Sequence, residues 1–287
     1  MNKDALPEEY NMMNDLVFKF VFGKEARKHI TIDFLNAVLA KYLGHEIEDL
    51  TFMQTEKSSN RKDGRSTRLD VVCQLNTGET VNIEMQVADQ GNMKKRSLFY
   101  WGRMYADSLP KNANFDKLRP AIMVNIVNFS FLSKQSPHSI YRFREEDTNE
   151  LYNQDIVVHF LEVPKLLKGK SVKEMNRVEK WLAYFSKRYS LKEKEEVAMS
   201  EAAIKEAVDA TKLFMADAKA RYAYYNREKA IRDWNQSIAT SRRKGREEGK
   251  ARLQNLIRKL IAAKRFDDVA QVTDDEKLAA LYAEFGI

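Results

Sequence analysis

Apolar residues near the start of the chain recur at helical spacing. The segment 15–22 is apolar nearly all round, and residues 25–43 place Ile32, Leu35 and Leu39 on one helical face. A further helix is expected over residues 92–109, because the pattern stops just before Pro110. The pattern therefore predicts two opening helices and a third one later in the chain.

Short apolar or alternating runs separate these helices and end at turn residues. They are rich in Val, Ile, Leu and Thr, which favour extended structure. The runs predict strands at 50–55, 67–75, 80–87, 121–127, 140–143 and 156–163. The first part of the chain is therefore expected to be a mixed α/β core.

From residue 172 onward the pattern changes. Gly and Pro almost disappear, and Ala, Glu, Lys, Arg and Leu dominate, which is typical of helices. We place a boundary near Ser190, with an α/β domain over residues 1–190 and an all-helical, basic C-terminal region over 191–287.

The composition narrows the class of protein. The chain has 287 residues, 44% of them hydrophobic, and a net charge of +7, which favours a globular protein with a polyanionic partner. One cysteine, Cys73, cannot form an internal disulfide or a thiolate cluster for zinc, and the four histidines lack ligand spacing. No apolar run reaches the length of a membrane span, so a soluble cytoplasmic protein without a membrane partner is expected.

One predicted hairpin carries candidate chemistry. The strands at 67–75 and 80–87 are joined at Asn76-Thr77-Gly78, and a three-residue loop that ends in Gly pairs Leu75 with Glu79. Counting back from this pair places Asp70 opposite Glu84. Two acids in that position repel each other unless a cation lies between them, which a divalent metal would do. Gln86 points to the same side as Glu84.

Each of these acids also has a simpler interpretation. An acid on a half-exposed strand is usually just solvated. Asp15 and Lys19 are one turn apart in the apolar opening helix, where they can form an ordinary helix ion pair. Alternatively, Asp15 is a third carboxylate of the same site. Because the hairpin already brings two acids together, we favour the interpretation in which Asp15 belongs to the same site.

The order of these segments resembles the PD-(D/E)XK nucleases, and within them the recombination-promoting nuclease and transposase family. An acid on an opening helix is followed by Asp and then by Glu-x-Gln across a hairpin. The resemblance covers roughly residues 9–190. It rests on 15–19 (Asp-x-x-Phe-Lys), 69–71 (Leu-Asp-Val), 83–86 (Ile-Glu-Met-Gln), 95–100 (Lys-Arg-Ser-Leu-Phe-Tyr), 118–122 (Leu-Arg-Pro-Ala-Ile) and 159–163 (His-Phe-Leu-Glu-Val).

The resemblance implies a restriction-endonuclease-like mixed sheet flanked by helices. It also implies Mg²⁺, which Mn²⁺ can replace, held by Asp70 and Glu84 with Asp15 as the supporting acid. Gln86 takes the place of the lysine found in the wider superfamily, and a neutral amide can only orient water by hydrogen bonds. The implied reaction is metal-dependent hydrolysis of DNA phosphodiester bonds, linked to recombination or mobile elements.

Basic side chains near this site are candidate DNA contacts, with solvated surfaces as the alternative. Lys19 is one. Arg96 and Arg103 recur with Tyr100 on one face of the predicted 92–109 helix. A turn-rich stretch beside the hairpin adds Lys57, Arg61, Lys62 and Arg65.

The C-terminal region has its own charge pattern. Residues 241–265 contain ten basic residues, among them Arg242, Arg243 and Lys244, and only two acidic residues, Glu247 and Glu248. Leucines and isoleucines line one face of the same segment, so an amphipathic basic helix is expected. Such a helix can bind DNA, lie on an anionic membrane or pack on a second subunit. We favour DNA contact with packing, including a homo-oligomer.

Two functions from different classes remain after these steps. The first is a DNA endonuclease. The second is a DNA-binding or assembly protein whose nuclease core is weak or silent.

Overall fold

The computed structural model describes residues 10–53 and 70–287. Six strands form one sheet in the order β1-β2-β3-β4-β6-β5. The first three strands pair antiparallel, β3, β4 and β6 run parallel, and β5 pairs antiparallel with β6. The strands are β1 (Leu50–Phe52), β2 (Val71–Leu75), β3 (Thr80–Gln86), β4 (Ala121–Val127), β5 (His138–Arg142) and β6 (Ile156–Glu162).

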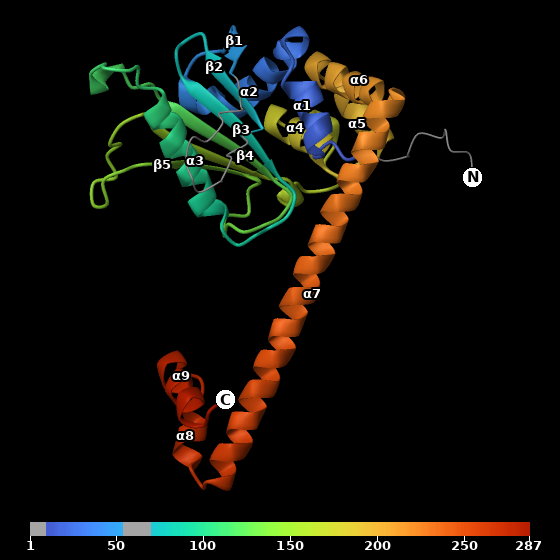
Figure 1. Cartoon of the computed structure of the whole chain (residues 1–287). Coiled ribbons are helices and arrows are strands. Elements are labelled where there is room, and N and C mark those ends of the chain that lie inside the picture. Colours follow the sequence, from blue (N-terminus) through green and yellow to red (C-terminus); the bar gives the residue numbers. More distant parts are fainter. Residues whose placement is uncertain (1–9, 54–69) are drawn as a thin grey trace, which may run out of the picture. The chain divides into compact units, whose positions relative to one another are not determined.

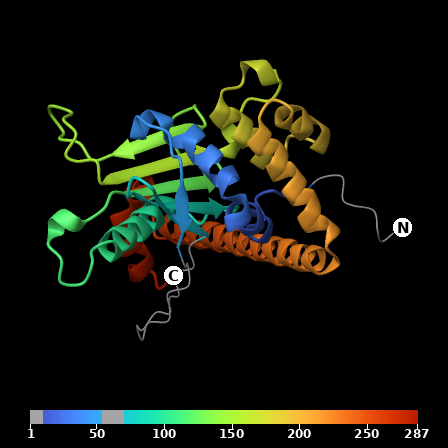
Figure 2. The same cartoon turned by 90° about the horizontal axis from the view of Figure 1, so that it is seen from above.

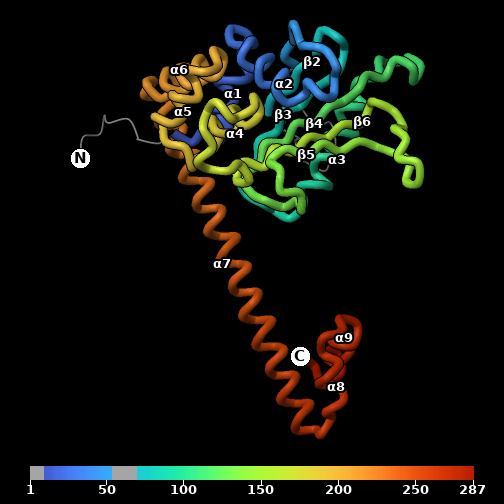
Figure 3. Tube along the Cα trace, turned by 180° about the vertical axis from the view of Figure 1, so that it is seen from behind, coloured from blue at the N-terminus to red at the C-terminus, as the bar shows by residue number. Residues whose placement is uncertain are grey.

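Helices cover both faces of this sheet. Helix α3 lies on one face, and α1, α2 and α4 lie on the other (Figures 1 and 3). Their bounds are α1 (Asp15–Phe22), α2 (Lys28–Leu43), α3 (Met93–Asp107) and α4 (Arg177–Phe185). The predicted mixed α/β core is confirmed. Five of the six strands begin within two residues of their predicted first residue, and β2 begins at Val71 instead of residue 67.

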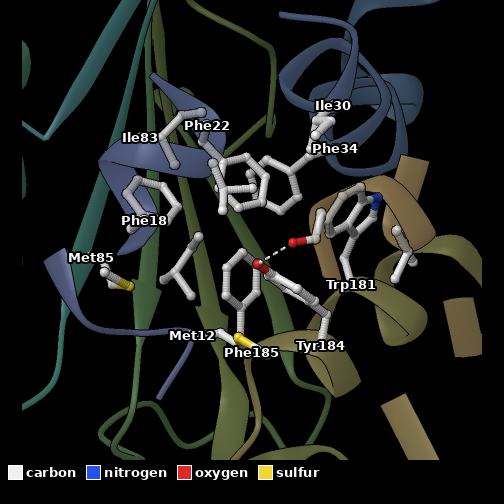
Figure 4. Close-up of a cluster of buried hydrophobic side chains, with 14 of the residues drawn as sticks. Met12, Phe18, Phe22, Ile30, Phe34, Ile83, Met85, Trp181, Tyr184 and Phe185 are labelled. Carbon is white, nitrogen blue, oxygen red and sulfur yellow. Dashed lines mark hydrogen bonds between the residues drawn. The ribbon is translucent and has the colours of Figure 1, made fainter. Parts of the chain in front are cut away.

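The main core lies between the sheet and α1, α2 and α4. Phe22 is fully buried, and its ring lies 5.7 Å from that of Phe34 and 5.6 Å from that of Trp181. Figure 4 shows these rings together with Phe18, Tyr184 and Phe185. Phe18 and Phe22 of the opening helix are thus core residues, as aromatic rings that bury large areas usually are.

The rest of the chain is helical, as its composition predicts. Helix α6 (Ala202–Ala216) packs on α1, and α5 (Leu191–Ala198) packs on α4 and α6, all in the same unit (Figure 2). They are followed by α7 (Ala218–Ala262), α8 (Phe266–Ala270) and α9 (Asp275–Glu284). None of the helices in the described ranges is both long and apolar enough to cross a membrane.

Contacts divide the chain into two compact units, residues 1–227 and 228–287. The second unit contains most of α7 together with α8 and α9. Leu256, Leu260 and Leu281 form its buried centre. The domain boundary near residue 190 remains a prediction, because it marks the start of helix-only sequence rather than a break in packing.

Candidate active site

The β2–β3 hairpin has the predicted register. The amide of Leu75 donates to the carbonyl of Glu79 at 2.9 Å, and Gly78 closes the turn with a positive φ of 106°. Val71 pairs with Ile83 at the other end. This pairing places Asp70, the residue before β2, opposite Glu84, as counting from the turn predicts.

Both carboxylate oxygens of Asp70 have a partner. Its Oδ1 lies 3.2 Å from Nζ of Lys19, which comes from α1 on the other side of the hairpin. Its Oδ2 accepts a hydrogen bond of 3.0 Å from the backbone amide of Met85. The side chain is only 13% exposed. These contacts fix the carboxylate just before the first residue of β2.

Glu84 is far more buried than an acid on a half-exposed strand. Its side chain is 2% exposed, and its Oε1 pairs with Nη2 of Arg96 at 2.5 Å. The other oxygen, Oε2, is buried and finds no hydrogen-bond partner among the described residues. The site therefore contains a carboxylate oxygen that lacks a donor beside a second carboxylate.

The electrostatics of Glu84 follow from this position. Burial, and secondly the charge of Asp70, raise the pKa of Glu84 to about 7, while Arg96 and, less strongly, the side chain of Asn82 act in the opposite direction. Desolvation penalises the charged form of a carboxyl group, and a like charge nearby adds to the penalty. The metal-free site thus holds its second negative charge only weakly at neutral pH.

Arg96 forms an ion pair with one of the two hairpin acids. Its guanidinium reaches from α3 to Glu84 and lies 5.1 Å from the ring centroid of Tyr100. The prediction that Arg96 binds phosphate stays a prediction, and this ion pair does not favour it, because the guanidinium already holds a buried carboxylate. Arg103, two turns later on the same helix, is half-buried. Its role in DNA binding stays a prediction.

Asp15 is not brought into one cluster with the two hairpin acids. It lies in the first turn of α1, and its Oδ1 pairs with Nε of Arg227 at 2.7 Å. Within residues 10–53 and 70–287, no group of three His, Cys, Asp or Glu side chains is arranged to hold a metal. The simple helix pair with Lys19 is not formed either, since Lys19 contacts Asp70 instead. The role of Asp15 as a supporting acid remains a prediction that this geometry does not favour.

Gln86 ends β3 on the same face as Glu84. Its side-chain amide donates to the backbone carbonyl of Ala88 at 3.3 Å. An amide in this position carries no charge and presents one remaining carbonyl oxygen. Lys57, Arg61, Lys62 and Arg65 lie outside the described residues, so their predicted DNA contacts stay predictions.

Two contacts were not anticipated. Arg96 sits twelve residues from Glu84, and only the placement of α3 over the sheet brings them together. The histidines also meet: Nε2 of His138 lies 2.9 Å from Nδ1 of His159, on the neighbouring strands β5 and β6. Burial lowers the pKa of both imidazoles, to about 4 and about 3. The sequence signal was weak because the two residues are 21 positions apart.

The ammonium of Lys19 and the carboxylate of Asp70 border an open cavity. It has a volume of about 420 Å³, and its other walls include Phe20, Phe52 and Met53. Among the described residues, Asp70 therefore borders the cavity on the side of α1, whereas Glu84 lies under α3.

Comparison with protein families matches residues 12–241 to the PD-(D/E)XK nuclease family transposases. The chain belongs to this family. The matched range contains α1, the hairpin with both acids, the whole sheet and α4 to α6. Its mixed six-stranded sheet between helices is a restriction-endonuclease-like α/β fold. No curated protein and no solved structure gives a significant match to the chain.

Membership of this family indicates the general kind of function. A PD-(D/E)XK nuclease family transposase has a nuclease or transposase-related role.

Proposed function

We propose that this protein is a metal-dependent DNA endonuclease whose cation is held by Asp70 and Glu84. The observation that carries the proposal is Oε2 of Glu84, a buried oxygen without a donor in the described structure, opposite a second carboxylate. A divalent cation would provide the missing partner and offset the repulsion between the acids. Mg²⁺, or Mn²⁺ in its place, fits two carboxylates, because Mg²⁺ usually binds through one or two of them and keeps several waters.

Each residue of the site has a distinct part in this proposal. When bound, the cation would polarise a phosphate oxygen and activate water. Arg96 fixes Oε1 of Glu84, so that Oε2 would be the oxygen that binds the cation. Met85 fixes Oδ2 of Asp70 through its backbone amide. Gln86 can orient a water molecule by hydrogen bonds but cannot neutralise charge.

DNA is the proposed substrate because of the family and the charge pattern. The residues from 241 to 250 are all exposed and include Arg242, Arg243 and Lys244. An exposed row of cations on a helix can contact successive phosphates. The transposase in the family's description supports a link to DNA recombination or mobile elements. A homo-oligomer through the C-terminal helices remains a prediction.

The alternative is a DNA-binding or assembly protein with a weak or silent nuclease core. Gln86 favours it, since a neutral amide replaces a cation that would stabilise developing charge. Incubation of the purified protein with supercoiled plasmid separates the two functions. We expect nicked or linear DNA with Mg²⁺ and intact plasmid with EDTA. Binding of the plasmid without any metal-dependent cutting would instead establish the alternative.

The basic segment of α7 is expected to determine how DNA affinity depends on salt. Replacing Arg242, Arg243, Lys244 and Arg246 with Gln removes four exposed cations. Each lost phosphate contact lowers the slope of log affinity against log salt by about 0.9. We therefore expect the slope to fall by up to about 3 to 4, measured by fluorescence anisotropy on a labelled duplex.

A matched variant controls for net charge alone. Lys111, Lys117, Lys168 and Lys173 are also exposed, and all four lie outside α7. Their replacement with Gln changes the net charge equally and should leave the salt slope near the wild-type value. Equal slopes for both variants would show that α7 makes no special contact with DNA.

A further inference from the structure

Lys19 is the cation on the open side of the acid pair. Its Nζ lies 3.2 Å from Oδ1 of Asp70, and the side chain is 28% exposed. Lys19 and Asp70 both line the cavity of about 420 Å³ at the end of α1. A lysine ammonium has three donors on a flexible stem, so one contact to Asp70 leaves donors for another anion.

The local sequence fixes this position. Asn14 caps α1 by accepting from the amide of Leu16 at 3.0 Å, and Val17, Phe18 and Val21 turn into the core. Lys19 therefore points away from the core side of the helix.

Gly23 ends α1 close to the first residue of β2. A Cβ at this position would lie 2.9 Å from the backbone oxygen of Lys19 and 3.5 Å from Cγ2 of Val71. The tight contact is with the helix's own backbone, and 3.5 Å to Val71 is an ordinary van der Waals distance, so the last turn of α1 lies directly beside the start of β2. Asp70 immediately precedes β2, so the carboxylate of Asp70 lies within reach of the Lys19 ammonium.

The other polar groups at the site are less suited to meet a phosphate. Arg96 is held by Glu84 beneath α3, on the covered acid. Gln86 is neutral and donates to the carbonyl of Ala88. Hydrolysis of a phosphodiester builds negative charge on the phosphate oxygens, and a positioned cation stabilises that charge. Lys19 combines a positive charge with access from the cavity.

We propose that Lys19 is a catalytic residue whose ammonium holds Asp70 in the metal-free protein and contacts the scissile phosphate once the cation has bound. This inference rests on the proposed nuclease function. Hydrolysis consumes one water, forms one P–O bond and breaks another, and leaves a phosphate monoester and a hydroxyl. Lys19 stays protonated throughout and transfers no proton. Its charge offsets the charge of the phosphate.

This role gives Lys19→Met two effects of opposite sign. Without the ammonium, the metal no longer competes with a positive charge at Asp70, so metal should bind about tenfold more tightly. Cleavage at saturating Mg²⁺ should nevertheless slow by about a hundredfold or more, as expected for loss of one group that stabilises the transition state. A purely structural role would weaken metal binding and cleavage together.

The test uses the full-length protein and two readouts. Metal affinity is obtained without DNA from the dependence of melting temperature on Mn²⁺ concentration. Cleavage is measured on plasmid at saturating Mg²⁺. Lys19→Arg should keep metal affinity near wild type because it keeps the charge. The double variant Lys19→Met, Gln86→Lys should recover part of the cleavage rate by returning an ammonium to the same face.

Lys111→Met is the matched control, because Lys111 is an exposed lysine that lies outside this cavity and away from the acid pair. It should leave metal affinity and the cleavage rate within about threefold of wild type. If Lys19→Met binds metal no more tightly and cuts as fast as wild type, Lys19 has no such role and the inference is overturned. If the wild-type protein neither responds to metal nor cuts, the proposed function itself fails, and this inference fails with it.

Discussion

Glu84→Gln is expected to stabilise the metal-free protein at pH 8 and to leave it nearly unchanged at pH 4.5. In the folded protein, burial and the Asp70 charge raise the pKa of Glu84 from 4.5 to about 7. Between these values the unfolded chain has lost a proton that the folded protein still holds, so the stability of the wild type falls as pH rises. Above pH 7 the full penalty is present. Gln carries no such penalty.

The size of the effect follows from the same shift. One unit of pKa corresponds to about 1.4 kcal/mol, so the rise from 4.5 to about 7 makes the expected gain at pH 8 about 3 kcal/mol. Gln also keeps an oxygen that can accept from Arg96. The measurement is urea denaturation at both pH values in EDTA. At pH 8 the variant should lose the response of its melting temperature to Mn²⁺, because one ligand is gone.

Glu48→Gln provides the control, since Glu48 is exposed and lies outside the site. It should follow the wild type at both pH values. A Glu84→Gln protein with the same stability difference from wild type at pH 4.5 and pH 8 would mean that Glu84 is not a strained buried acid.

Much of the fold could be read from local patterns. Periodicity located the opening helix at residues 15–22, and the structure places α1 at Asp15–Phe22. The loop at Asn76-Thr77-Gly78 gave the hairpin register, because turn length and register are linked by local geometry. These features depend on neighbours in sequence. They were therefore accessible without knowledge of the three-dimensional packing.

The partners of the site residues depend on packing between distant segments. Asp15 meets Arg227, which is 212 residues away, and no local pattern indicates that contact. Glu84 is 2% exposed because α3 covers the strand, although alternation alone suggested a half-exposed position. The pairing of Arg96 with Glu84 could not be predicted for the same reason. The sequence indicates which helix face carries Arg96 but not which surface lies opposite that face.

The central claim is that Asp70 and Glu84 together hold a divalent cation that enables cleavage. Asp70→Asn tests it with the least disturbance. Asn keeps an oxygen that can accept from the amide of Met85, whose bond to Asp70 is 3.0 Å. The variant loses the Lys19 ion pair but also the repulsion with Glu84. These changes oppose each other, so the metal-free protein should melt close to the wild type.

The decisive measurement is the melting temperature of wild type and Asp70→Asn over a series of Mn²⁺ concentrations, with plasmid cleavage measured on the same samples. Wild type should gain about 2.7 kcal/mol of stability at a hundred times the dissociation constant. Asp70→Asn should show little metal response and no detectable cleavage. If both proteins instead gain the same stability from Mn²⁺ and cut plasmid equally well, the two hairpin acids do not form the metal site.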